Sequence, residues 1–236
     1  MEKIIFTYRI TSDTGFAPCV DDGLLTLACC KGGKKTYRCG LRNFIGCFFE
    51  KGLNKEAEVY VSGIYDNKLL YLAKITEVIE MKEYFSDKKY KKRLDQIYEL
   101  KNGELKRKPN YLPNTHNDEN ANLCDINGKY VLISDKFVYL GEKALKIDNE
   151  ILKYYPKGRG QFPIGQHKNS PAEVLSEQNI KNSNELYKKL EELITKEGYN
   201  LTEGKIKEPN TPIVDGGCRC SIKQSNDKKC GSCVKE

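Results

Sequence analysis

The amino-acid sequence predicts an α+β fold with a mixed, largely antiparallel sheet and with helices mainly in the C-terminal half. Strand-like segments dominate the first half of the 236 residues, while helical patterns gather in the later part. Residues 57–65 and 68–75 are strand candidates on either side of Asp66 and Asn67, a pattern typical of a β-hairpin with a two-residue turn. Strands and helices segregated along the chain in this way indicate an α+β architecture.

The N-terminal region alternates predicted strands with two polar loops. The apolar stretch 4–10 runs into the acidic loop SDTGFAP (residues 12–18), and the apolar stretch 24–30 runs into the basic loop KGGKK (residues 31–35). A rigid loop at the end of a strand is where chemistry is often placed, and Asp13 holds such a position. Glycine permits close backbone approach and proline stiffens the loop. The simpler interpretation is a turn in which Asp13 only bonds local backbone N–H groups.

The middle of the chain predicts further strands and one helix. We expect a strand at residues 43–49 and a helix capped by Ser86. Residues 101–128 are polar and turn-rich, which predicts a long loop, and long loops in compact domains are often functional. Strand character returns at residues 129–139. The apolar face of the helix after Ser86 would consist of Tyr90, Leu94, Ile97 and Tyr98.

The C-terminal part predicts helices followed by a polar tail. The segment SPAE (residues 170–173) is a capping box with proline at the first helical position, so a helix starts there. A second helix is predicted over residues 184–197, with Gly198 as its stop signal. Its apolar face consists of Leu186, Leu190, Leu193 and Ile194. The predicted domains are an α+β core (1–169), a helical segment packed on it (170–204) and a Cys-rich tail (205–236).

Composition argues against a membrane protein. Only 39% of the residues are hydrophobic and 31% are charged, and no apolar run approaches the ~20 residues of a membrane span. The N-terminus shows no signal-peptide pattern. We therefore expect a cytoplasmic protein with no membrane partner.

The charge distribution favours a nucleic-acid partner. The chain has 40 basic and 33 acidic residues, a net charge of +7, and residues 31–42 hold five basic residues and no acidic one. Such clusters suit DNA phosphates, although a lysine-rich solvated surface is the alternative. The basic segments 31–34 and 158–160 are too short for a nucleotide-binding loop and fit DNA phosphates better. The candidates for contact with the DNA backbone are Lys31, Lys34, Lys35, Arg38, Arg42, Arg159 and Lys168.

The tail carries a candidate metal site. It contains the pairs CRC (residues 218–220) and CGSC (residues 230–233), whose four thiolates match the number that a tetrahedral structural zinc site needs. The tail is too short and polar to build a core of its own. A thiol-rich tail without metal is the alternative, because Cys-x-Cys is a less usual spacing. We predict one structural zinc, and no cofactor for catalysis, with Cys218, Cys220, Cys230 and Cys233 as the ligands.

Several segments resemble the second nucleotide-modification-associated domain family. They run in order across roughly residues 6–168. The segments are DTGFAP (13–18), LTLACCK (25–31), YxxRxDxIY (90–98), ISxxFxYxG (133–141), and GRG (158–160) followed by His167. The family's name implies a link to modified DNA bases, often in phage or phage-defence settings, and we associate such domains with excision of hypermodified bases from phage DNA. The resemblance does not by itself fix a reaction.

Base excision would give these residues specific roles. An enzyme acting on a base must take it out of the duplex and hold it in a pocket. Cleavage of the N-glycosidic bond builds positive charge on the sugar, which a carboxylate can stabilise. A helix-surface position for Asp95 and a phosphate or backbone contact for His167 are the simpler alternatives. The catalytic candidates are Asp13, Asn43, Asp95 and His167, and the base-binding candidates are Tyr8, Thr14 and Phe16.

The sequence thus predicts a DNA glycosylase that removes a bulky modified base, such as a modified cytosine of phage DNA, as antiviral defence. Its partner would be double-stranded DNA with modified bases. A module that flips and reads the base without cutting is the first alternative. An enzyme that installs or edits the modification is the second, but no donor-binding motif is visible and no small-molecule donor is expected.

Overall fold

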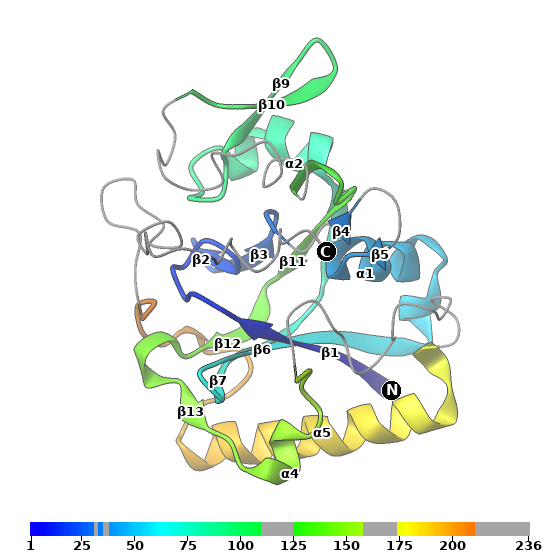
Figure 1. The fold of residues 1–236 in the computed structure, drawn as a ribbon, viewed down its shortest axis with the longest axis vertical. Helices are drawn as coiled ribbons and strands as arrows, with labels where there is room; N and C mark the ends of the chain where they lie inside the picture. The colour runs from blue at the N-terminus through cyan, green and yellow to red at the C-terminus, as the bar shows by residue number, and fades with distance from the viewer. Residues whose placement is uncertain (31–32, 35–37, 110–124, 158–173, 211–236) are drawn as a thin grey trace, which may run out of the picture.

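A mixed sheet forms the centre of the molecule (Figure 1). The structure is a computed structural model that describes residues 1–30, 33–34, 38–109, 125–157 and 174–210. Within these residues the central sheet has six strands. In spatial order they are β1 (Glu2–Ile10), β6 (Ala57–Tyr65), β7 (Lys68–Lys74), β12 (Lys136–Tyr139) and β14 (Gly204–Lys205), and β13 (Leu145–Lys146) also pairs with β7.

The predicted hairpin is confirmed at the heart of this sheet. Strands β6 and β7 are antiparallel and are joined by Asp66 and Asn67. Both turn residues have left-handed backbone conformations, with φ of 49° and 56°. A type I′ turn requires such values, and Asp and Asn tolerate them better than other residues with side chains. β7 and β12 are also antiparallel, whereas β1–β6 and β12–β14 are parallel.

A second, antiparallel sheet lies beside the central one. Its order is β2 (Cys19–Asp21), β3 (Leu24–Leu27), β11 (Tyr130–Ser134) and β8 (Glu77–Glu80). The strand predicted at residues 129–139 is present but is interrupted at Asp135, so that its first half joins this sheet and its second half joins the central sheet. The chain changes sheet in the same way between β7 and β8. These two crossings tie the sheets together.

Two short hairpins extend from this framework. β9 (Tyr98–Lys101) pairs with β10 (Glu104–Arg107), and β4 (Gly33–Lys34) pairs with β5 (Arg38–Cys39). The first hairpin occupies the start of the predicted loop 101–128, which is therefore partly ordered as strand. Its turn uses Asn102 and Gly103, which both have positive φ. Residues 110–124 of the predicted loop lie outside the described part of the chain.

The strand predicted at residues 43–49 is wrong, because this segment belongs to helix α1 (Leu41–Glu50). Its apolar residues recur at helical spacing, so that Leu41, Phe44, Ile45 and Phe48 are buried on one face. Gly46 lets the helix approach β11 closely, because a side chain there would overlap the ring of Tyr130. The consecutive aromatic residues hid this period in the sequence.

The helix predicted after Ser86 is also wrong. Helix α2 (Met81–Ser86) ends at Ser86, a short 3-10 turn η2 (Lys88–Tyr90) follows, and Tyr98 already lies in β9. Residues 91–97 are irregular because their polar groups bond to other segments of the protein rather than to a helix of their own. Tertiary contacts here override a pattern that fits a helical face.

Helix α5 (Glu177–Lys196) begins before the predicted residue 184 and ends where expected, with Gly198 at positive φ. Leu186, Leu190 and Ile194 are buried as predicted. The capping box at residues 170–173 lies outside the described residues. Further short helical elements are η1 (Leu53–Lys55), η3 (Gly141–Lys143) and α4 (Asn149–Leu152).

Three hydrophobic clusters fill the spaces between the layers of the molecule. Figure 1 shows how these layers are arranged. The first lies between the central sheet on one side and α1 with the second sheet on the other. The second packs α4 and α5 on the opposite face of the central sheet. The third packs α2 and β9 against the outer face of the second sheet. This arrangement confirms the predicted α+β class.

Helix α5 also closes the outer edge of β1. The Oγ of Ser183 accepts a hydrogen bond from the backbone N–H of Ile5, and the Oδ1 of Asn184 accepts one from Lys3. An exposed edge strand is a site for unwanted pairing, and these helix side chains satisfy it. Within the described residues, no helix is long and apolar enough to cross a membrane.

Candidate functional site

The side chain of Asp13 is buried at the point where strand β1 ends and the acidic loop begins. Only 1% of the residue is exposed. Its Oδ1 accepts a hydrogen bond from the hydroxyl of Tyr139 at 2.5 Å. Its Oδ2 accepts two from Asn210, one from the backbone N–H and one from the side-chain amide, both at 2.8 Å. Asp13 is therefore not a turn residue that bonds only its own loop, because it joins β1, β12 and the C-terminal segment.

Three tyrosines of the central sheet form a buried group next to this carboxylate: Tyr139 bonds it directly, the charge of Asp13 acts on Tyr8, and Tyr71 bonds Tyr8. The hydroxyl of Tyr71 donates to the hydroxyl of Tyr8 at 2.8 Å, and the two rings meet edge to face. Burial raises the pKa of Tyr8 and Tyr139, and the negative charge of Asp13 adds to both shifts. Burial also raises the pKa of Tyr71. All three phenols therefore remain protonated at neutral pH and can act as hydrogen-bond donors.

A strap formed by residues 204–210 covers Asp13. The backbone N–H of Ile206 donates to the carbonyl of Tyr139 at 2.8 Å, and the N–H of Glu142 donates to the carbonyl of Glu208 at 2.9 Å. The side-chain amide of Asn210 also donates to the carbonyl of Gly141 at 3.1 Å. The strap therefore runs along β12 and ends on the carboxylate. The predicted domain boundary at 205 falls inside this bonded segment.

Glycines in the acidic loop and after β12 allow this close approach. Gly15 has φ of +73°, and a Cβ there would lie 2.6 Å from the Cγ of Pro209. Gly141 has φ of +56°, and a Cβ there would overlap the carbonyl oxygens of Lys207 and Glu208. Only glycine fits both the backbone conformation and the space at these positions.

The base-binding candidates are buried in the hydrophobic clusters. Phe16 is 2% exposed and packs in the third cluster, so its predicted role as a stacking surface for a base is wrong for this conformation. Tyr8 lies in the first cluster, and its hydroxyl belongs to the phenol group beside Asp13. Thr14 is also buried. Stacking on a base requires an accessible ring face, which Phe16 does not offer.

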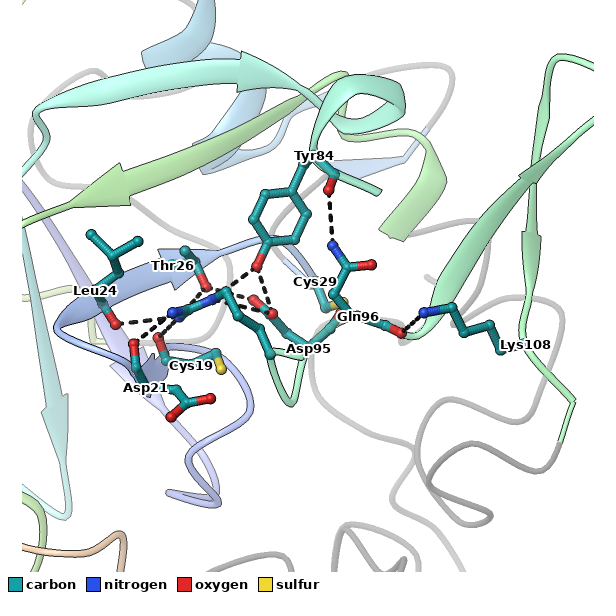
Figure 2. A network of polar contacts seen from close by, with 10 residues as sticks. Cys19, Asp21, Leu24, Thr26, Cys29, Tyr84, Asp95, Gln96 and Lys108 are labelled. Carbon is teal, nitrogen blue, oxygen red and sulfur yellow. Dashed lines mark hydrogen bonds and ion pairs between the residues drawn. The ribbon is translucent and has the colours of Figure 1, made fainter. Parts of the chain in front are cut away.

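Asp95 lies in a separate buried network, not on a helix surface (Figure 2). Its Oδ2 accepts from the hydroxyl of Thr26 at 2.5 Å, and its Oδ1 accepts from the hydroxyl of Tyr84 at 2.6 Å. The Nε of Arg93 lies 3.8 Å from the same Oδ1. Burial raises the pKa of Asp95, while Arg93 and the two hydroxyls act in the opposite direction. The carboxylate is thus held by β3, α2 and the irregular segment.

Arg93 extends this network to the second sheet. Its guanidinium donates to the carbonyls of Cys19, Asp21 and Leu24, which belong to β2 and β3. Gln96 and Lys108 continue the chain of contacts on the other side (Figure 2), since the Lys108 ammonium donates to the Gln96 carbonyl at 2.7 Å. The network connects the irregular segment to backbone carbonyls of β2 and β3. This geometry is that of a structural brace. The predicted catalytic role of Asp95 is not supported by these contacts.

Arg42 is an internal brace and not a contact for DNA, which corrects the prediction. The residue is fully buried. Its guanidinium donates to the carbonyls of Cys30, Asp125 and Tyr130 at 2.6–2.8 Å. The carboxylate of Asp125 in turn accepts from the N–H of Cys30 and the hydroxyl of Tyr98. A guanidinium enclosed in this way cannot reach a phosphate.

Asn43 has a similar structural role at the start of α1. Its amide donates to the carbonyl of Asn127 at 2.7 Å, and its Oδ1 accepts from the N–H of Lys129 at 2.6 Å. Both ends of the amide thus bond the segment that leads into β11. This placement corrects the prediction of Asn43 as a catalytic residue.

Of the remaining candidates, Lys34 and Arg38 face each other as a backbone pair in the β4–β5 hairpin. The other predicted residues lie outside the described part of the chain, and their roles stay predictions: Lys31, Lys35, Arg159, His167, Lys168, Cys218, Cys220, Cys230 and Cys233. Among the described residues, no group of three or more His, Cys, Asp or Glu side chains could hold a metal ion.

Sequence reasoning missed Tyr139 and Asn210, which hold Asp13. Tyr139 was visible as part of the pattern ISxxFxYxG, but residues 137–139 of β12 are all buried, so no alternation of burial singled out its side chain. Asn210 gave no signal, because it follows a polar segment with no periodicity. Similarly, the pattern YxxRxDxIY supplies Arg93, Asp95 and Tyr98 to the buried networks.

Comparison with known proteins gives one assignment. No curated protein and no solved structure matches the chain significantly. The sequence model of the family described as nucleotide modification associated domain 2 matches residues 1–188. This range includes Asp13, Tyr139 and both buried arginines, and it ends before the strap. The match spans most of the chain, and the protein therefore belongs to the nucleotide modification associated domain 2 family.

Proposed function

We propose that this protein is a DNA glycosylase that removes a modified base from double-stranded DNA. Membership in a nucleotide-modification-associated family supports the modified base and the nucleic-acid context. The net charge of +7 supports a polyanionic partner. The proposed setting is defence against phages whose DNA carries bulky modified bases, such as modified cytosines.

One observation carries the proposal. Asp13 presents a buried carboxylate in fixed orientation, held by Tyr139 through one oxygen and by Asn210 through the other. Electrostatic stabilisation of a transition state is most effective where the stabilising group is preorganised and shielded from bulk water. Asp13 is the sequence-predicted catalytic candidate that combines these properties with a position on a loop at a strand end.

The proposed reaction is hydrolysis of the N-glycosidic bond. As the bond between the sugar carbon and the base nitrogen lengthens, positive charge develops on the sugar, and the Asp13 carboxylate stabilises it. A water molecule adds to the sugar carbon and gives up one proton, and the base leaves with a proton on its nitrogen. The products are the free base and an abasic site. The phenol of Tyr139 donates its one hydrogen to Asp13 and would hold the carboxylate in orientation during this step.

The burial of Asp13 favours a second candidate. A carboxylate that is 1% exposed can also serve only to fasten the strap, and the protein would then read a flipped base without cutting it. Base flipping is common to both candidates, so binding to modified DNA does not separate them. Release of the base does.

The test is a reaction of the full chain with two duplexes of identical sequence, one carrying phage-type modified cytosines and the other unmodified. Mass spectrometry of the soluble fraction measures the released base, and an aldehyde-reactive probe measures abasic sites. The proposal predicts both products from the modified duplex and neither from the unmodified one. Tight binding to the modified duplex without release would establish the reader instead.

A further inference from the structure

We propose that Asn210 is a positioning residue for Asp13, and that the strap of residues 204–210 completes the site from outside the family domain. This inference rests on the proposed function, because it assigns a role in catalysis at the same carboxylate. The family match ends at residue 188, so the strap is a contribution of the chain's own C-terminal segment.

The strap is docked specifically. β14 pairs in parallel with β12, and three further hydrogen bonds continue the contact as far as Asn210. Pro209 is buried against Gly15, so the strap touches the acidic loop as well as β12. The side chains of Lys205, Lys207 and Glu208 are exposed. Pro209 and Asn210 of the strap thus contact the protein interior, whereas its charged side chains face the solvent.

Asn210 determines the orientation of the Asp13 carboxylate. Tyr139 of β12 holds Oδ1, and the two N–H donors of Asn210 hold Oδ2. A carboxylate bonded at both oxygens cannot rotate about its terminal bond without losing hydrogen bonds. Loss of the amide donor leaves one of these hydrogen bonds on each oxygen and so weakens the restraint on this rotation. Misplacement of a catalytic group by about 1 Å can cost on the order of a hundredfold in rate.

The geometry predicts different rates of base release for two truncated chains whose ends differ by seven residues. A chain ending at Asn210 keeps the strap and loses only the Cys-rich tail, and it should release base at the rate of the full chain. A chain ending at Glu203 loses the strap and should release base at least tenfold more slowly. The substitution Asn210→Ala removes the side-chain donor and keeps the backbone one. It should lower kcat about tenfold with little change in KM.

The matched control is Lys207→Ala, which alters an exposed side chain of the same strap and should change neither kcat nor KM. Asn210→Ala introduced beside Asp13→Asn should cause no further loss, because groups that act as a unit are not additive. Thermal melts of each variant show whether the chain is folded at the assay temperature. If the chain ending at Glu203 does not fold, the comparison of Asn210→Ala with Lys207→Ala tests the inference.

Two results would overturn the inference. One is equal kcat for Asn210→Ala and the wild type. The other is a faster reaction of the chain ending at Glu203, which would make the strap an inhibitory cover over Asp13 and not a part of its site. A normal rate for Asp13→Asn is a different result, because it would remove the proposed function and not merely the role of Asn210.

Discussion

Asp13 and Asp95 are both buried carboxylates, but the protein holds them in different ways. Asp95 lies between α2 and β3 beside Arg93, whose guanidinium bonds three backbone carbonyls of the second sheet. Asp13 lies beyond the end of β1 and receives neutral donors from Tyr139 and from the strap. The Asp95 network joins elements of the core, whereas the Asp13 site is closed by the strap, which contains the last described residues of the chain.

The difference separates structural from catalytic candidates. A buried ion pair that bonds the backbone of several strands is expensive to break, and its main effect is on folding. Asp13 lies on a loop at a strand end, where a hydroxyl of the central sheet and two N–H groups of the strap hold it, and its main effect is proposed to be on base release. The two sites should therefore respond differently when each is altered.

The largest effect should follow from Arg93→Met. This change leaves Asp95 buried without its cation, and breaking a buried pair in this way costs about 3–5 kcal/mol. Chemical denaturation measures the free energy of unfolding. Lys188→Met is the control, because the pair Lys188–Glu192 is exposed and such pairs contribute about 0–1 kcal/mol. A cost below about 1 kcal/mol for Arg93→Met would show that the network is not a brace.

The same variant should gain relative stability in acid. Burial raises the pKa of Asp95 in the folded protein, and Arg93 opposes that shift, so the pKa rises further without Arg93. A carboxyl group whose folded-state pKa exceeds its unfolded value binds protons on folding, and its contribution to stability falls as pH rises through that range. The deficit of Arg93→Met should therefore shrink between neutral pH and about pH 4. A deficit independent of pH would contradict this account.

A smaller effect on the rate of base release is expected when Gly15→Ala is compared with Gly52→Ala. Both glycines have φ of +73°, so alanine is equally strained at each, with an expected cost of about 1 kcal/mol. At Gly15 the new Cβ also meets Pro209, whereas at Gly52 it meets nothing within 4 Å. Gly15→Ala should therefore displace the strap and lower the rate of base release, and Gly52→Ala should not. Equal rates would show that strap docking does not affect Asp13.

The smallest effect concerns the predicted DNA contacts Lys34 and Lys35, of which Lys34 lies in the described part of the β4–β5 hairpin. Replacing Lys34 and Lys35 by alanine should flatten the dependence of log affinity for DNA on log salt by about one to two units, since each phosphate contact contributes about 0.9. The control is Lys181→Ala with Lys188→Ala on α5, which lies across the central sheet from the hairpin (Figure 1). An unchanged slope for the hairpin variant would remove these lysines from the interface.

Local patterns were sufficient to predict part of this structure. The turn at Asp66 and Asn67 and the buried face of α5 were predictable because each depends on residues close in sequence. Helix α1 and the irregular segment before Tyr98 were not, since their conformations depend on packing against β11 and on bonds made by Arg93. The loop position of Asp13 could be read directly, but its partners Tyr139 and Asn210 lie 126 and 197 residues away.

The central claim is that Asp13 stabilises the transition state of base release. It is tested most directly by the rate at which Asp13→Asn forms abasic sites in modified DNA, measured beside the wild type under conditions where both are folded and bound. The account predicts a loss on the order of a hundredfold or more, as when one electrostatic stabiliser is removed from an active site. An Asp13→Asn protein that forms abasic sites at the wild-type rate would contradict it.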